Sequence, residues 1–223
     1  MIKAILFDID NTLIDFMHMK KKSCEAAVEA MISAGLDMKK EEVMKEIYEI
    51  YDKYGMEYQK IFQKLLKKLK RKVDYRIVAS GIIAYREVRE IYLVPYTGVI
   101  PVLTALKKKY KLGIISDAPS MQAWMRLITM KIDGFFDVIV TKGDVKKQKI
   151  YPVPFNSALK QLKMKPEEVL MVGDRIERDI IIPKKLGMKT CFARYGVENP
   201  PAKGKSGADF EIDNIEELIG VVE

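Results

Sequence analysis

The sequence predicts an α/β fold in which a parallel sheet, covered by helices on both faces, is interrupted by an inserted all-helical unit. Three observations indicate this: an apolar strand at the start of the chain, a long helical stretch after it, and short apolar strands alternating with helices beyond Pro95. Such alternation is typical of parallel sheets with right-handed crossovers. We therefore expect a core of residues 1–15 and 96–223 and a helical unit of residues 16–95.

The first strand lies within residues 1–10, in the run IKAILFD. Its apolar residues are continuous rather than alternating, which indicates a strand that is buried on both faces. Polar residues follow it directly. Because open parallel sheets bind ligands at the carboxyl ends of their strands, these residues are candidates for a functional site.

Residues 19–94 show helical periodicity, with apolar side chains at steps of three and four, as in Val43, Ile47 and Ile50. Breaks near Gly35, near Gly55 and at residues 70–74 divide the stretch. The pattern predicts about four helices, which is enough for a small bundle.

The rest of the chain alternates between the two kinds of element. The predicted strands are 112–116, 138–141, 169–173, 190–193 and 210–212, and the predicted helices are 100–109, one through Trp124, 155–162 and 177–186. Pro183 lies inside the last of these, so we expect that helix to start late or to kink there. A final helix is expected to begin at Asp213 or Asn214, both of which are favourable caps.

Composition limits the classes of protein. At 223 residues and 48% hydrophobic, the chain can fill a core without metal or disulfide support. Cys24 and Cys191 lack metal-binding spacing and favour a reducing cytoplasm. No run suggests a targeting segment or a membrane span, so we expect a soluble cytoplasmic protein. The net charge of +8 is spread over mixed Lys and Glu, a composition that also suits a thermophile, and assigns no nucleic-acid partner.

Two acidic clusters follow predicted strands. Asp8 and Asp10, in the segment DIDNT that ends with Thr12, share one face of the first strand, where a divalent cation would stabilise both charged forms. Asp174 and Asp179 follow the strand VLMV through Gly173, in the segment GDRIERD. A solvated turn or a helix cap would explain either cluster alone, but together they form an oxygen-rich site that suits Mg²⁺.

Two further clusters are less specific when taken singly. Ser116 and Asp117 end the strand LGIIS; a hydroxyl there can donate to a phosphate oxygen, although both residues are also ordinary helix caps. Lys149 precedes a turn that contains Pro152, and a fixed cation could balance phosphoryl oxygens there. A lysine-rich loop with Lys146 and Lys147 is, however, usually solvated surface.

The four clusters, in this order and spacing, resemble the haloacid dehalogenase-like hydrolase superfamily over nearly the whole chain. DIDNT matches its DxDxT signature, Ser116 its strand-end Ser or Thr, Lys149 its Lys, and GDRIERD its GDxxxxD. Relatives often read Lys-Pro-x-Pro, whereas here Ile150 follows the lysine. The opening DIDNTLID and residues 81–103 are similar to archaeal glyceraldehyde 3-phosphate phosphatases.

The resemblance implies a Rossmann-like core with a helical cap and a Mg²⁺-dependent phosphatase. In it Asp8 would be the nucleophile that forms an aspartyl-phosphate, and Asp10 the general acid and base. The carboxylates of Asp8 and Asp174 and the carbonyl of Asp10 would hold the metal. The remaining implied roles are support by Asp179 and Thr12, phosphate binding by Ser116, Asp117 and Lys149, and substrate contacts by cap candidates Phe16, His18, Tyr85, Arg86 and Arg89.

Several alternatives remain open at this point. A phosphomutase would keep every one of these residues, while a dehalogenase would not need Asp10 or Mg²⁺ in the same way. A nucleic-acid-binding module could use the basic residues 64–72, although that run is also typical of the solvated face of an amphipathic helix. The expected partner is a small phosphorylated metabolite, with no nucleic acid and no membrane, and a homodimer is left open.

Overall fold

The computed structural model describes residues 1–69 and 72–222. The chain divides into two compact units, one made of Met1–Phe16 with the residues from Val94 onward, and one made of Met17–Leu93. Within the described residues, no helix combines the length and the apolarity that a membrane span requires.

The first unit is built on a parallel sheet, and the predicted fold class is confirmed. Its six described strands are β1 (Ala4–Phe7), β2 (Lys111–Ser116), β3 (Val138–Thr141), β4 (Val169–Gly173), β5 (Lys189–Ala193) and β6 (Phe210–Ile212). They lie in the order β3-β2-β1-β4-β5-β6. The chain therefore winds away from β1 in one direction through β2 and β3, and in the other through β4 to β6. In such sheets ligands bind at the topological switch point, where the strand order reverses, here at the carboxyl ends of β1 and β4.

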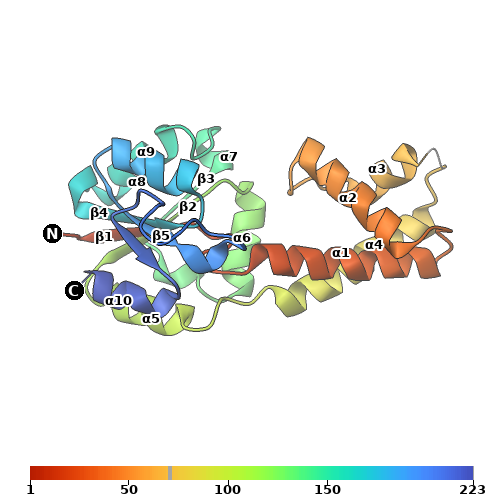
Figure 1. Cartoon of the computed structure of the whole chain (residues 1–223), viewed down its shortest axis with the longest axis horizontal. Helices are drawn as coiled ribbons and strands as arrows, with labels where there is room; N and C mark the ends of the chain where they lie inside the picture. Colours follow the sequence, from red (N-terminus) through yellow and green to blue (C-terminus); the bar gives the residue numbers. More distant parts are fainter. Residues whose placement is uncertain (70–71, 223) are drawn as a thin grey trace. The chain divides into compact units, whose positions relative to one another are not determined.

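Helices cover both faces of this sheet (Figure 1). On one face lie α8 (Val153–Leu162) and α9 (Ile181–Lys185), and on the other lie α5 (Val99–Lys107) and α10 (Leu218–Val222). Leu6 and Met171 of the sheet are fully buried with Phe155 of α8 in a common cluster. The continuous apolar run of β1 is buried on both faces because each face is covered by a helical layer.

The predicted helix 177–186 is wrong in one respect, because two elements replace it. A π-helical turn, η3 (Ile176–Ile180), leads into α9. Pro183 lies in the first turn of α9, where its missing N–H leaves no helical hydrogen bond unmade. The helix thus starts late, as the position of the proline suggested.

Several short elements were not predicted. They are the single helical turn α7 (Lys142–Val145) and the 3-10 turns η1 (Asp133–Phe135), η2 (Pro166–Glu168) and η4 (Arg194–Gly196). Thr141 and Asp144 cap α7 reciprocally. The helix through Trp124 is α6 (Ser120–Thr129), and Asn214 caps η5 (Ile215–Glu217), which leads into α10.

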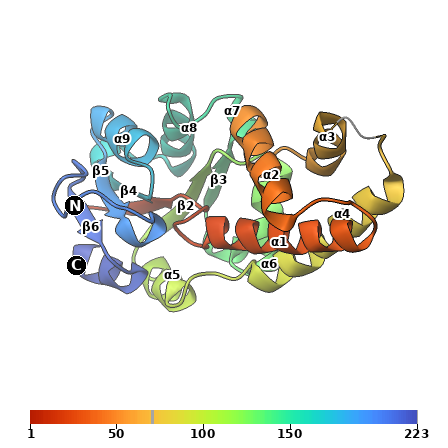
Figure 2. The same cartoon turned by 45° about the vertical axis from the view of Figure 1, so that its right-hand side comes forward.

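The second unit is helical, as predicted. Its four described helices are α1 (Phe16–Ser33), α2 (Lys40–Tyr54), α3 (Ile61–Lys68) and α4 (Tyr75–Tyr92), shown in Figure 2. Met31, Val43, Ile47 and Leu65 are buried in their shared core, so the residues with helical spacing form the packed faces. Asp74 caps α4 by accepting the N–H of Arg76 at 2.8 Å. The predicted break at 70–74 and the basic run 64–72 both include residues 70 and 71, which lie outside the described residues.

Candidate active site

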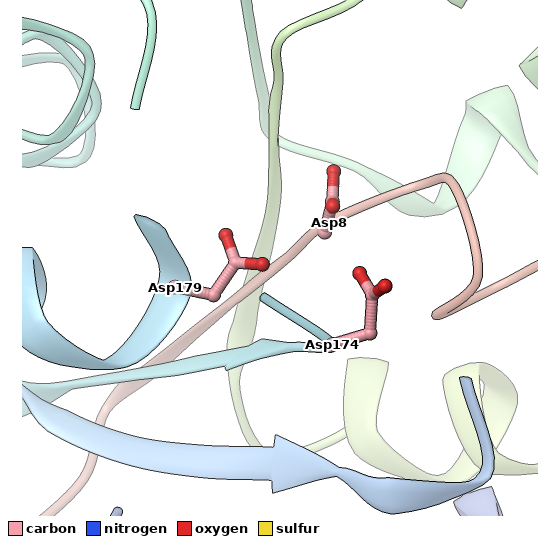
Figure 3. Close-up of side chains that lie close together, drawn as sticks. All are labelled: Asp8, Asp174 and Asp179. Carbon is pink, nitrogen blue, oxygen red and sulfur yellow. The ribbon is translucent and has the colours of Figure 1, made fainter. Parts of the chain in front are cut away.

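Three buried aspartates lie close together at the topological switch point, beside the carboxyl ends of β1 and β4 (Figure 3). Asp8 directly follows β1, Asp174 directly follows β4, and Asp179 lies in the turn η3. Each offers a carboxylate oxygen, and these three oxygens lie within 4.8 Å of one another. The pairing of β1 with β4 brings together residues that are far apart in the chain.

Lys149 places a buried ammonium beside two of these carboxylates. Its side chain is 1% exposed, and Nζ lies 2.8 Å from Asp8 Oδ1 and 2.7 Å from Asp179 Oδ1. Burial acts to lower the pKa of Lys149, but the charges of Asp179 and Asp8 outweigh it and hold that pKa above its ordinary value. The lysine therefore remains a cation, whereas Lys146 and Lys147 nearby are exposed.

Asp179 serves to hold Lys149 and the turn after β4. Its Oδ1 pairs with the lysine, and its Oδ2 accepts the backbone N–H of Arg175 at 3.0 Å. The carboxylate packs so closely on Gly173 that a Cβ there would lie 2.4 Å from Asp179 Cγ. Burial raises the pKa of Asp179 to about 6 even though Lys149 opposes that shift. With both oxygens engaged, Asp179 supports the site rather than presenting a ligand atom.

Asp174 has the features of a metal ligand. Its Oδ1 is buried and has no hydrogen-bond donor among the described residues, while Oδ2 accepts Asn11 Nδ2 at 3.4 Å. Burial, reinforced by the charges of Asp8 and Asp179, raises the pKa of Asp174 to about 8. When all three aspartates are ionised, three negative charges face the buried ammonium of Lys149 and the largely exposed guanidinium of Arg175, whose Nε lies 3.5 Å from Asp174 Oδ2. A divalent cation with a preference for oxygen ligands, such as Mg²⁺, fits the remaining excess of negative charge.

Ser116 and Asp117 form the turn after β2. Ser116 Oγ accepts the N–H of Ala118 at 3.1 Å, which leaves its own hydrogen to donate to an anion. Asp117 accepts the backbone N–H of Lys149 at 2.7 Å and a guanidinium hydrogen of Arg178 at 2.9 Å. The Asp117 carboxylate already accepts two hydrogen bonds and has no hydrogen to donate to phosphate. Any contact of Asp117 with phosphate would therefore come from its main chain.

The segment after Asp8 is supported by residues that the sequence did not single out. Tyr195 donates its hydroxyl hydrogen to the carbonyl of Thr12 at 2.8 Å. The hydroxyl of Thr12 is buried, and no described residue is its hydrogen-bond partner. Asn11 adopts the left-handed region with φ 57°, and Gly196 packs against its carbonyl. Gly196 ends the 3-10 turn η4 and has no motif around it, so only the tertiary contact reveals its importance.

Gly196→Ala is expected to destabilise the protein by about 1–3 kcal/mol, the usual range for an overpacked site, and to lower turnover. The added Cβ would lie 1.9 Å from the carbonyl oxygen of Asn11 and 2.9 Å from Asp174 Cβ, so both acidic segments must shift. Chemical denaturation and initial rates measure the two effects. Gly220→Ala is the matched control, because a Cβ at Gly220 meets nothing within 4 Å. Equal behaviour of the two variants would contradict the prediction.

Asp10 lies beside the aspartate cluster and contacts a buried arginine that the sequence analysis missed. Asp10 Oδ2 accepts Arg126 Nη1 at 3.1 Å. The guanidinium carbon of Arg126 also lies 4.5 Å from the ring centre of Phe16, one of the predicted substrate contacts. The available signal was a charged residue within the buried stripe of α6, between Ala123 and Leu127.

The other predicted substrate contacts lie in the helical unit. His18 of α1 makes an edge contact with Tyr92 at 5.3 Å, and Tyr85 of α4 makes one with Phe62 at 6.1 Å. Arg86 is exposed and Arg89 is half-buried, both on α4.

Comparison with known proteins identifies relatives along the whole chain. Residues 5–193 match the family described as haloacid dehalogenase-like hydrolase. A Methanopyrus kandleri protein named glyceraldehyde 3-phosphate phosphatase is 35% identical and covers 100% of this chain and 97% of its own. A Pyrococcus furiosus protein of the same name is 34% identical over 100% of this chain and 93% of its own. The crystal structure of a HAD phosphatase from Thermococcus onnurineus gives a TM-score of 0.67 at 25% identity, covering 99% of this chain and 98% of that one.

Proposed function

The chain belongs to the haloacid dehalogenase-like hydrolase family as a phosphatase, and we propose that it hydrolyses a small phosphomonoester through an aspartyl-phosphate, with Mg²⁺ as cofactor. The observation that carries this proposal is the position of Asp8 at the end of β1, between the ammonium of Lys149 and the carboxylate of Asp174. The substrate that we propose is glyceraldehyde 3-phosphate or a close analogue, since the relatives with that name match the full length of the chain.

Asp8 has the surroundings that a carboxylate nucleophile requires. Its Oδ1 pairs with Lys149 and accepts the N–H of Ile9 at 2.8 Å, so the carboxylate is fixed in orientation beside a buried cation. Attack of Asp8 on phosphorus forms the acyl phosphate and breaks the bond to the substrate oxygen. Asp10 donates a proton to that leaving oxygen, later takes one from the attacking water, and free phosphate is released.

Positioning and charge dominate phosphoryl transfer, and this site supplies both. Ser116 donates to a phosphoryl oxygen, and Lys149 balances negative charge in a buried setting, where electrostatic interactions are stronger than in water. Mg²⁺, held by the carboxylates of Asp8 and Asp174 and the carbonyl of Asp10, would neutralise charge on the phosphoryl group when bound. Arg86, Arg89 and His18 are the residues of the helical unit that we propose to test for substrate selection.

The test is release of free phosphate from a panel of triose phosphates, sugar phosphates, nucleotides and para-nitrophenyl phosphate. We expect activity with Mg²⁺ and the highest kcat/KM for a triose phosphate. Conversion of a sugar phosphate to its isomer without phosphate release would instead favour a phosphomutase. Inactivity on every compound, together with salt-sensitive nucleic-acid binding, would overturn the proposal.

Chelation is expected to abolish phosphate release, and added Mg²⁺ is expected to restore it, because the buried carboxylates need a cation to bind a phosphate anion beside them. Asp174→Asn should raise the Mg²⁺ concentration for half-maximal activity by at least about 10- to 100-fold, the usual loss when only an outer-shell partner of a metal ligand is changed. A Mg²⁺ titration of initial rates measures this shift. Asp52→Asn, at an exposed position in α2, is the matched control. Full activity of chelated enzyme would contradict the expectation.

A further inference from the structure

Arg126 is a charged residue in a buried setting. It lies on the same stripe of α6 as Ala123 and Leu127, and its side chain is 7% exposed. A guanidinium in such surroundings is stable only with partners that compensate for lost water. Two such partners are the Asp10 carboxylate, 3.1 Å from Nη1, and the ring of Phe16 at 4.5 Å.

Asp10 needs a defined side-chain orientation for its proposed task. It sits in the irregular segment that follows β1, next to Asn11 with its left-handed backbone. The Asp10 side chain is 25% exposed, compared with 9% for Asp8, so packing restrains it less. A charged donor in a rigid helix can supply the restraint that packing does not.

We propose that Arg126 is a positioning residue that holds the Asp10 carboxylate in the orientation required for proton transfer, an inference that rests on the proposed function. A guanidinium stays protonated at every physiological pH, so Arg126 orients Asp10 and takes no part in moving the proton. Its helix, α6, begins four residues after Ser116, the proposed phosphate donor. The same helix therefore links the turn that binds phosphate to the group that protonates the leaving oxygen.

The test uses two substrates that differ in how much they need a general acid. An alkyl phosphate, such as glycerol phosphate, has a poor leaving oxygen that must be protonated as it departs. The aryl oxygen of para-nitrophenyl phosphate leaves readily without that help. Since kcat/KM reports the steps up to the first phosphoryl transfer, its ratio for the two substrates isolates the contribution of Asp10 to departure.

Arg126→Met is expected to lower kcat/KM for the alkyl phosphate by about 10²-fold, the lower end of what general acid catalysis contributes. It should lower kcat/KM for the aryl phosphate by less than about 10-fold. The ratio of kcat/KM for the alkyl phosphate to that for the aryl phosphate should therefore fall by at least about 10-fold. Arg126→Lys, which keeps the charge without the planar fork, should fall between wild type and Arg126→Met. In an Asp10→Asn background, Arg126→Met should cause little further loss, because both changes remove the same function.

Arg194→Met is the matched control, since Arg194 is also largely buried, at 13% exposure, and pairs with Glu211 and Asp213. It should change kcat/KM for both substrates by the same factor. Should Arg126→Met fail to fold, Arg126→Lys carries the same comparison.

The other possible results distinguish failure of the proposed function from failure of the role assigned to Arg126. If wild type hydrolyses neither substrate, or if Asp10→Asn matches wild type, the proposed function fails. If Asp10→Asn loses activity while the Arg126 variants leave the substrate ratio unchanged, raise the rate, or add fully to Asp10→Asn, the role assigned to Arg126 is overturned.

Discussion

Asp8→Asn should abolish phosphate release, with a loss of at least about 10⁴-fold, as is usual when a covalent nucleophile is removed. The amide keeps the size and shape of the carboxylate but cannot attack phosphorus. Lys149 retains Asp179 at 2.7 Å, so no buried cation is left without an anion and the fold should persist. Initial rates and thermal unfolding, measured on the same preparation, separate loss of chemistry from loss of structure.

The covalent intermediate provides an independent readout. Rapid acid quench of wild type during turnover of a ³²P-labelled substrate should trap labelled protein, and Asp8→Asn should trap none. Asp133→Asn makes the same chemical change in η1, at the end of the sheet opposite the aspartate cluster, and should retain full labelling. Turnover by folded Asp8→Asn would show that another group is the nucleophile.

Lys149→Met is expected to lower both activity and stability strongly. The variant leaves Asp8 and Asp179 buried without their shared cation, and breaking a buried ion pair by removing one partner typically costs about 3–5 kcal/mol. Loss of a fixed charge beside the phosphoryl group should reduce kcat by about 10²- to 10³-fold, by analogy with removal of one oxyanion-stabilising group. Urea unfolding and initial rates measure the two losses.

A double variant separates the two roles of Lys149. In Lys149→Met with Asp179→Asn one of the two uncompensated carboxylates is neutral, so part of the lost free energy of unfolding should return while activity stays low. Lys147→Met, an exposed position on the same segment, is the matched control and should behave as wild type. Wild-type turnover in Lys149→Met, or recovery of turnover in the double variant, would contradict the role of the buried ammonium.

The positions of strands and helices followed from local patterns. The apolar runs VIV and VLMV lie in β3 (138–141) and β4 (169–173) at the predicted bounds, because strands between two helical layers are mostly apolar. The one-turn helix α7 was missed because four residues are too few to show a helical period. The turn η3 has no distinctive apolar period, and its Asp179 pairs with Lys149, a residue thirty positions away in the chain that a local pattern does not reveal.

The sequence by itself determined the strands, the longer helices, the parallel sheet and the presence of polar clusters after particular strands, since these depend on hydrophobic period and on residues near one another in the chain. Only the tertiary structure decided which charges meet. It buries Lys149 between Asp8 and Asp179. In it the carboxylate of Asp117 accepts the backbone N–H of Lys149, and Arg126 donates to Asp10. Such pairings join segments tens to more than a hundred residues apart, and they are selected because a charge removed from water must find its partner within the fold.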